Sequence, residues 1–291
     1  MTVLALDLGA TKLAAALLAD DGRVLRTARR PTPTTDVVAE CVAVLREAAA
    51  AEPIRAVGIG SAGPVDAASG TVDPVNIPQL RGVRLVDAIA AAFGGVPVTL
   101  AGDGACMALG EQRFGAGRGV PNMLGVVVSS GVGGGLVLGG QLVTGRTGNA
   151  AHLGHIVADP QGEPCPCGGS GCVETVSSGP SAVRWAQAHG WAGADGHALA
   201  VSVRDGDPVA IAAVQRAGTA LGVALASAAA LTDVDLVVLG GGFAAVGAPL
   251  WAAARAAIAT HARMSFVQGL RLIPAELGAQ AGLVGAAALV L

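Results

Sequence analysis

The stretch that decides the fold is Val3–Lys12, which reads VLALDLGATK. An apolar run of strand length contains Asp7, a glycine turn follows at Gly9, and a second apolar run begins at Leu13. The pattern returns at Met123–Leu138, which reads MLGVVVSSGVGGGLVL, with Gly131 in the place of Gly9. A repeated strand–glycine turn–strand unit indicates an internal duplication, and it predicts two similar α/β halves.

Working outward from these hairpins, apolar runs and turn residues predict the remaining elements. The expected strands are Val3–Leu8, Leu13–Leu18, Arg23–Ala28, Ala56–Gly60, Val96–Leu100, Met123–Val128, Gly135–Leu138, Asp235–Leu239 and Leu270–Pro274. The expected helices are Thr35–Ala50, Leu85–Phe93, Asp103–Phe114, Ser181–His189, Leu199–Arg204, Pro208–Leu231, Pro249–Thr260 and Ala279–Leu291. Strands that alternate with helices predict an α/β fold with largely parallel pairing after each initial hairpin.

A length of 291 residues indicates two domains or one large one, and the duplication favours two. We predict a small N-terminal α/β domain of residues 1–104, closed by a C-terminal helix in residues 277–291. Residues 105–276 would form a larger α/β domain. The two glycine turns would face each other across a cleft and present backbone N–H groups to one phosphate chain.

The composition excludes several classes of protein. The 44 glycines follow no short period, which excludes a collagen-like chain. Mean hydropathy is high, at +0.60, but the apolar run Ala220–Leu231 stops at Thr232 and Asp233, short of the ~20 residues of a membrane span. The chain enters a strand without a signal peptide pattern, and its net charge of −3 gives no basic surface for nucleic acid. We therefore expect a cytoplasmic protein with neither a membrane nor a nucleic-acid partner.

Three of the five cysteines lie together in the stretch HLGHIVADPQGEPCPCGGSGCVE, His152–Glu174. Cys165, Cys167 and Cys172 follow His155, and thiolate and imidazole are the ligands that zinc prefers in a closed site. An odd number of cysteines beside a histidine favours metal over disulfides. A metal would also hold together a loop too rich in Gly and Pro to form a core.

The two glycine turns are candidate phosphate sites. In DLGATK, Gly9 allows close backbone approach, Thr11 and Lys12 can contact phosphate oxygens, and Asp7 can hold a metal-bound water. A glycine turn in a hairpin needs no function, and neither turn is a Walker A sequence; the duplication is what favours phosphate binding.

Two further positions have a functional and a structural interpretation. Asp103 opens a predicted helix, where it is either an N-cap or a general base for phosphoryl transfer to a hydroxyl. Gly240–Gly242 follows a strand and is either a simple β–α turn or a flat slot for a nucleotide base.

Together these motifs resemble those of the ROK family (repressors, open reading frames, kinases), in particular its sugar kinases, over essentially the whole chain. The matching segments are DLGATK at Asp7–Lys12, GIGSAGPVD at Gly58–Asp66, NIP at Asn76–Pro78, the Asp103–Glu111 helix, SGVGGG at Ser130–Gly135, LGH at Leu153–His155, CPCGGSGCVE at Cys165–Glu174, LGGGFA at Leu239–Ala244 and AGLVGAA at Ala281–Ala287.

The resemblance implies an actin-like, ribonuclease H-like ATPase fold, ATP with Mg²⁺, and ATP-dependent transfer to the 6-hydroxyl of a hexose or amino sugar. Asp103 would be the catalytic base, and structural zinc would bind His155, Cys165, Cys167 and Cys172. Nucleotide would be bound by Asp7, Gly9, Thr11, Lys12, Ser130, Gly131, Gly133, Gly241 and Gly242. The sugar would be bound by Gly63, Asn76, Gly102, Asp103, His152, His155 and Glu174. The resemblance also implies a homodimer. Because the sequence leaves no room for it before Val3, we expect this chain to lack the extra DNA-binding domain of the family's repressors.

Two positions depart from the family's sugar kinases. They usually have Asn where this chain has Gly102, and Glu where it has His152, and both residues contact sugar hydroxyls. Lost or altered contacts to a hydroxyl can change discrimination by orders of magnitude. A modified or amino sugar, or weak and broad use of hexoses, is therefore as consistent with the sequence as glucose. The alternatives are a sugar-sensing protein that has lost catalysis and a zinc hydrolase; four protein ligands would leave that zinc no position for water.

Overall fold

The computed structural model describes residues 2–291, which form two compact units. Unit 1 contains the chain up to Pro121 together with Gly135–Ala151 and Glu276–Leu291, and unit 2 contains Asn122–Gly134 and His152–Ala275. The domain boundary after residue 104 stays a prediction. By internal contacts the following helix, α3 (Asp103–Phe114), groups with unit 1, because it packs against α9 (Ala281–Ala288) of the same unit.

Unit 1 is built on a five-stranded sheet in the order β3-β2-β1-β4-β8. β1 and β2 form the predicted antiparallel hairpin, and β4 and β8 then add in parallel, as expected. The strands are β1 (Thr2–Leu8), β2 (Lys12–Ala19), β3 (Val24–Pro31), β4 (Ile54–Ser61) and β8 (Val98–Gly102). β1, β4 and β8 therefore present their carboxyl ends at one edge, where open α/β sheets bind ligands.

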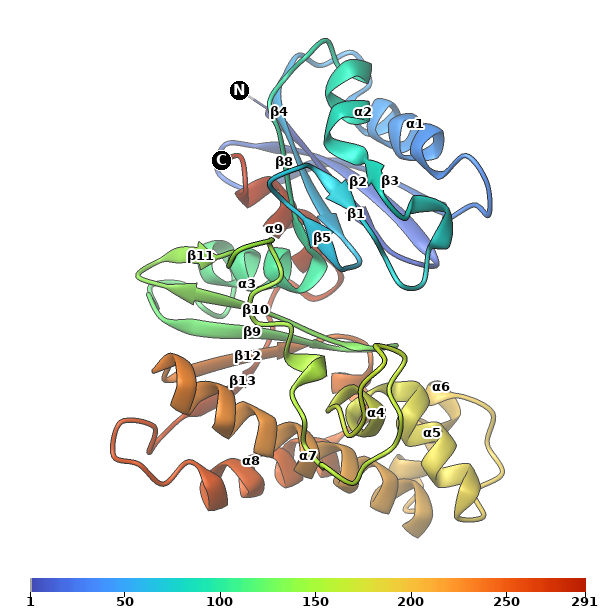
Figure 1. The fold of residues 1–291 in the computed structure, drawn as a ribbon, viewed down its shortest axis with the longest axis vertical. Coiled ribbons are helices and arrows are strands. Elements are labelled where there is room, and N and C mark those ends of the chain that lie inside the picture. Colours follow the sequence, from blue (N-terminus) through green and yellow to red (C-terminus); the bar gives the residue numbers. More distant parts are fainter. Residues whose placement is uncertain (1) are drawn as a thin grey trace. The chain divides into compact units, whose positions relative to one another are not determined.

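Alternation along β1 divides the core of unit 1 between two faces. Leu4 and Leu6 pack with α1 (Val37–Ala49) and α2 (Leu85–Ala92), which cover one side of the sheet (Figure 1). Val3 and Ala5 belong to a cluster with α9 and α3 on the other face. The two faces together bury most apolar residues of the strands.

Glycines let α9 approach its neighbours at backbone distance. A Cβ on Gly285 would overlap the backbone of Cys106 in α3, and a Cβ on Gly58 in β4 would overlap Ala286. The small-residue motif at Ala281–Ala287 is thus explained by close packing. Nearby, the buried Glu111 carboxylate accepts backbone hydrogen bonds from Ala116, Glu276 and Leu277 at 2.8–3.1 Å, which fixes the residues where the chain returns to unit 1.

Short elements that the sequence pattern did not predict complete unit 1. They are a three-stranded sheet of β5 (Val65–Asp66), β6 (Thr71–Val72) and β7 (Val83–Arg84), the 3-10 turns Pro78–Leu80 and Gly278–Gln280, and β11 (Gln141–Val143). β11 pairs with β10 (Val132–Leu138), which begins in unit 2 and continues into unit 1.

Unit 2 contains parallel strands in the order β9-β12-β13, with bounds Met123–Val128, Leu236–Gly240 and Arg271–Pro274. Consecutive β9 and β10 are neighbours in the sheet order, so the second glycine turn also closes a hairpin. The helices are α4 (Glu174–Ser177), α5 (Gly179–Ala188), α6 (Gly196–Arg204), α7 (Pro208–Thr232) and α8 (Ala248–His261), with 3-10 turns at Leu153–His155 and Phe243–Val246. The predicted repetition of hairpin and parallel strands is thereby confirmed.

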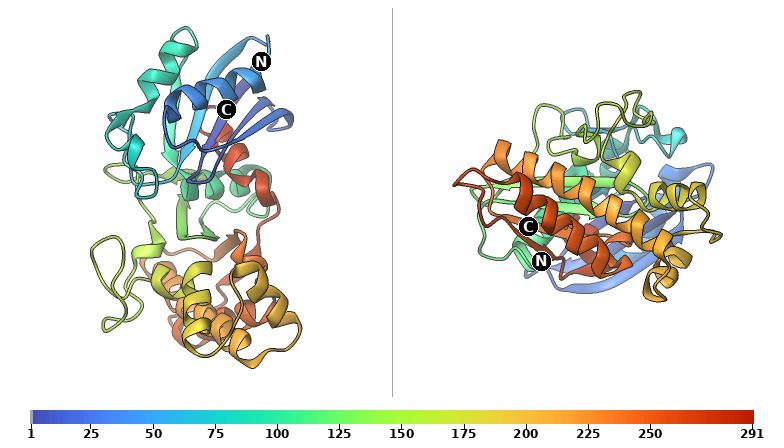
Figure 2. Two further views of the ribbon diagram at one scale, coloured as in Figure 1. Left: turned by 90° about the vertical axis from the view of Figure 1, so that its right-hand side faces the viewer. Right: turned by 90° about the horizontal axis from the view of Figure 1, so that it is seen from below.

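The long helix α7 is strongly apolar. In the described part of the chain it is the one helix long and apolar enough to cross a membrane, since it starts well before the apolar run seen in the sequence. However, 56% of its most apolar window is buried inside the protein, and it runs beside α8 (Figure 2). This burial fits a core helix of unit 2.

Candidate active site

The carboxyl ends of three strands bring the first group of predicted residues together in unit 1. Leu8, Ser61 and Gly102 occupy one row across β1, β4 and β8. Past this row, the backbone N–H of Ala62 donates to Leu8 O at 2.9 Å, so the Gly63 loop lies beside the first glycine turn. Asp103 follows Gly102 directly at the first turn of α3.

Asp7 and Asp103 form a pair of electrostatically coupled carboxylates. Burial, reinforced by the Asp103 charge, raises the pKa of Asp7 to about 6, while Lys12 and Arg29 oppose this rise. Asp103 is accessible to solvent, yet the surrounding protein desolvates its carboxylate enough to raise its pKa. Its Oδ1 accepts the Gly104 N–H at 2.7 Å, which partly offsets that rise. Two carboxylates held this way favour a bound cation or proton.

The first glycine turn is held by its own backbone and by one threonine. Gly9 N–H donates to Lys12 O at 3.0 Å, and Thr32 Oγ1 donates to Gly9 O at 2.7 Å. The side chains of Thr11 and Lys12 are left exposed at the turn. This arrangement leaves a hydroxyl and an ammonium group available to an anion.

The predicted sugar residues of unit 1 lie around the same strand ends. Val75 N–H donates to Gly63 O at 3.3 Å, which places exposed Asn76 one residue from the segment bonded to the Gly63 loop. A Cβ built on Gly102 would meet no atom of the described residues within 4 Å. The position beside Asp103 is therefore open enough to accept a larger side chain.

In unit 2 the second glycine turn is held by Glu174. The carboxylate of Glu174 accepts the Val132 N–H at 2.9 Å, and a Cβ on Gly131 would come within 2.6 Å of Glu174 Oε2. Ser129 N–H closes the turn by donating to Gly131 O at 2.9 Å, and the Ser130 side chain is exposed. Ser130, Gly131 and Gly133 thus occupy a turn whose shape depends on a glycine and on the half-buried carboxylate of Glu174.

The LGGGF motif lies against this same turn. Gly241 has φ +96°, and a Cβ there would overlap Val128 O, so only glycine fits. Gly242 faces Ser129 Oγ, which a Cβ would meet at 3.7 Å. Both glycines are exposed, which leaves the backbone uncovered beside the second turn.

His152 and His155 lie next to Glu174. Their ring centroids are 5.0 Å apart, and Gly154 between them packs directly on the Val132 carbonyl. Partial burial and the neighbouring His155 lower the pKa of His152, against the opposing effect of Glu174. A neutral imidazole both donates and accepts hydrogen bonds.

The predicted metal ligands converge. His155, Cys165, Cys167 and Cys172 place one ligand atom each within 4.8 Å of one another. Cys165 Sγ lies 3.7 Å from His155 Nδ1, and Cys167 Sγ lies 3.7 Å from Cys172 Sγ. Tetrahedral zinc separates its ligand atoms by about 3.5–3.8 Å, so both the donor set and the spacing fit. The thiols form no disulfide.

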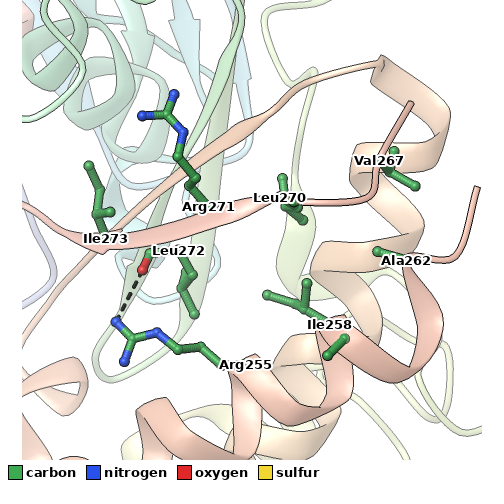
Figure 3. A pocket seen from close by; sticks show the side chains of 10 residues that line it. Arg255, Ile258, Ala262, Val267, Leu270, Arg271, Leu272 and Ile273 are labelled. Carbon is green, nitrogen blue, oxygen red and sulfur yellow. Dashed lines mark hydrogen bonds between the residues drawn. The ribbon is translucent and has the colours of Figure 1, made fainter. Parts of the chain in front are cut away.

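A separate cavity of ≈ 440 Å³ lies between α8 and β13 in unit 2 (Figure 3). The Arg255 guanidinium donates to Leu272 O at 3.2 Å across it, and the Arg271 side chain points away from Arg255. The lining includes none of the predicted site residues. With few converging polar groups, this cavity lacks the features of the catalytic site.

Two positioning residues escaped the sequence pattern. Thr32 holds the first turn, as described above. Asn149 accepts from the Val65 N–H at 3.0 Å and donates to the Val65 carbonyl, which fixes the end of the Gly63 loop. The strand-end position of Thr32 was a usable signal, whereas nothing in the sequence marks Asn149.

Removing a zinc ligand tests the metal site. We expect one zinc per chain, and we expect Cys172→Ser to lose the zinc and about 3 kcal/mol or more of stability, because structural zinc contributes to folding directly. Metal analysis and denaturant unfolding are the measurements. Cys41→Ala, at a buried cysteine of α1, is the matched control and should keep its zinc. Zinc well below one per wild-type chain contradicts the assignment.

The Asp7 carboxyl predicts a pH-dependent stability. Because its pKa rises from 3.8 to about 6 on folding, the native state binds more protons than the unfolded state, and stability falls as pH rises between these values. Asp7→Asn should therefore be more stable than wild type above pH 6 by on the order of 2 to 3 kcal/mol. The difference should vanish below about pH 4. A pH-independent difference in urea unfolding argues against a desolvated Asp7.

Curated relatives match nearly the full chain. The glucokinase of Thermotoga maritima is 33% identical over 310 residues, covering 100% of this chain and 97% of its own length. The N-acetylmannosamine kinase of Escherichia fergusonii is 38% identical over 248 residues, covering 83% of each protein.

Solved structures agree with these relatives. A ROK family glucokinase from Streptomyces griseus, in complex with glucose and AMPPNP, has a TM-score of 0.87 and 33% identity, covering 99% of both chains. A ROK family transcriptional regulator homologous to the E. coli MLC protein has a TM-score of 0.87 and 29% identity, covering 99% of this chain and 77% of its own. These neighbours confirm the predicted actin-like ATPase fold with two domains. The ROK family model matches residues 3–291, and the chain belongs to the ROK family.

Proposed function

We propose that this chain is an ATP-dependent sugar kinase that transfers the γ-phosphoryl group to the 6-hydroxyl of a hexose or amino sugar. The observation that carries the proposal is the position of Asp103 beside Asp7 at the carboxyl ends of β1, β4 and β8. The identity of 33–38% to a glucokinase and an N-acetylmannosamine kinase supports the same class of reaction.

Asp103 is the proposed general base. Asp103 is an exposed residue, and desolvation of its carboxylate by the surrounding protein raises its pKa above that of a free aspartate. A higher pKa makes a carboxylate a better acceptor for the proton that a sugar hydroxyl loses during transfer. Phosphoryl transfer otherwise depends on positioning and on stabilisation of charge.

The nucleotide phosphates are assigned to the two glycine turns. In unit 1, Gly9 gives close backbone approach and Thr11 and Lys12 offer exposed donors. In unit 2, Ser130, Gly131 and Gly133 form the second turn, whose Val132 N–H is already taken by Glu174. The uncovered backbone of Gly241 and Gly242 is assigned to the nucleotide base.

Mg²⁺ bound with ATP would neutralise charge on the phosphates. The donor set suits a hard cation, since the Asp7 carboxylate is desolvated and lies near a second carboxylate. Asp7 is therefore the proposed ligand, directly or through water. Lys12 opposes the same negative charge from the other end of the turn.

The proposed sugar contacts are described for each unit separately. Unit 1 contributes Gly63, Asn76 and the open space at Gly102. In unit 2, the Nδ1 atom of His155 belongs to the cysteine cluster, so its Nε2 is the atom assigned to a sugar hydroxyl. Glu174 has one oxygen committed to Val132, and His152 offers a neutral imidazole.

The open space at Gly102 supports a sugar larger than glucose. No atom of the described residues would obstruct a Cβ there, and His152 replaces an anionic acceptor with a group that also donates. An N-acetyl or other amino-sugar substituent needs both volume and mixed hydrogen bonding. We therefore rank amino sugars with glucose as substrates.

A sugar-responsive protein without catalysis is the second candidate. The observation in its favour is the TM-score of 0.87 to a ROK family transcriptional regulator. It predicts sugar binding without phosphoryl transfer. We also propose a homodimer and a cytoplasmic location. Light scattering on the purified chain would test the homodimer.

Replacing the proposed base tests the mechanism. Asp103→Asn should lower kcat by about 10²- to 10⁴-fold, because it removes the proton acceptor, while KM values change little. The matched control is Asp207→Asn at the N-cap of α7, which should retain kcat within about 2-fold. The measurement is ADP release with hexoses and amino sugars. Unreduced turnover in Asp103→Asn contradicts the proposal.

Restoring the family's residues tests specificity. A Cβ at position 102 meets no atom of the described residues within 4 Å. Gly102→Asn combined with His152→Glu should shift the ratio of kcat/KM toward glucose over amino sugars by on the order of 10-fold or more, because it rebuilds hydroxyl contacts. Each single variant should give part of the shift. An unchanged ratio in the double variant would exclude these positions from sugar discrimination.

A further inference from the structure

Arg29 lies on the same face of the unit 1 sheet as Asp7. The register pairs Asp7 with Ala14 across β1 and β2, and Ala14 with Arg29 across β2 and β3. Residues paired in this way project to the same side of a sheet. In the sheet, Ala14 is the residue between Asp7 and Arg29, which lie about 10 Å apart across two strand spacings.

The neighbouring arginines of β3 confirm this orientation. Arg30 pairs with Glu40 and Glu47 of α1 at 2.9 and 2.8 Å, and Arg26 donates to the Ala48 and Ala49 carbonyls. Both therefore face α1. Arg29, between them in the alternation, faces the opposite side.

The end of β3 also lies at the first glycine turn. Thr32 N–H donates to Thr11 O at 3.2 Å, and Thr32 Oγ1 donates to Gly9 O at 2.7 Å. Arg29 is three residues from this contact. Within residues 2–291 its exposed side chain has no ion pair or hydrogen bond, in contrast to Arg26 and Arg30.

We propose that Arg29 is a further phosphate-binding residue of the first glycine turn, acting on the phosphate chain of the nucleotide together with Thr11 and Lys12. This rests on the proposed kinase function. A guanidinium group suits the task because its planar donors match two phosphate oxygens. The charge of Arg29 already acts on the Asp7 carboxylate beside the first glycine turn, since it lowers the pKa of Asp7 against the effect of burial.

The test compares Arg29→Ala and Arg29→Lys with Arg30→Ala, whose arginine faces α1. Calorimetry with Mg²⁺ and a non-hydrolysable ATP analogue gives Kd, and steady-state kinetics give KM for ATP and for sugar. Arg29→Ala should raise Kd and the KM for ATP by on the order of 10-fold, with the KM for sugar unchanged. Arg29→Lys should recover part of this loss, and Arg30→Ala should bind nucleotide like wild type.

The outcomes separate the two proposals. If wild type binds the analogue and Arg29→Ala binds it equally well, the role of Arg29 is wrong and the kinase proposal stands. An equal loss of nucleotide affinity in Arg30→Ala also overturns the role of Arg29, because the loss would then reflect a change in overall charge. If wild type binds no nucleotide, both proposals fail. Thermal unfolding should give all three variants native-like melting, since these arginines are at an edge strand.

Discussion

The electrostatic coupling of Asp7 and Asp103 is the constraint on which unit 1 depends. Protein atoms desolvate both carboxylates, and each raised pKa records a cost of keeping charge at this place. Lys12 and Arg29 oppose that cost at Asp7. Stability alone would favour neutral side chains here, and the cost of keeping the pair supports the proposal that unit 1 binds a cation at this place.

In unit 2 a side-chain hydrogen bond holds the second glycine turn. Glu174 accepts the Val132 N–H, and it follows Cys172 of the cysteine cluster by two residues. A zinc bound by the four predicted ligands would therefore do more than close a loop: it would help to position the Glu174 carboxylate and His155, whose Nδ1 belongs to the cluster. The Arg216–Glu163 ion pair, at 3.8 Å, further links this loop to α7. Loss of the metal should consequently affect the glycine turn as well as stability.

The repeated hairpin, the parallel strands after it and the cysteine cluster could all be predicted from the sequence, because each depends on local spacing or on chemically distinctive residues. Other features could not. Strands of two residues, such as Val65–Asp66, are too short for any periodicity. The face of Arg29 depends on the register of two strand pairs, and Asn149 acts on Val65 through a contact between residues far apart in the chain. The bond from Val132 to Glu174 likewise needs the three-dimensional fold.

The identity of the sugar depends on two substituted positions, since Gly102 adds space and His152 adds a hydrogen-bond donor. The proposed reaction is transfer of the γ-phosphoryl group from ATP to a sugar. Phosphorus NMR of the purified chain with ATP, Mg²⁺ and a panel of hexoses and amino sugars tests it most directly. We predict one phosphomonoester on the primary 6-hydroxyl of the sugar for each ADP formed. Sugar that binds but is never phosphorylated, or ATP consumed without a sugar phosphate, would contradict it.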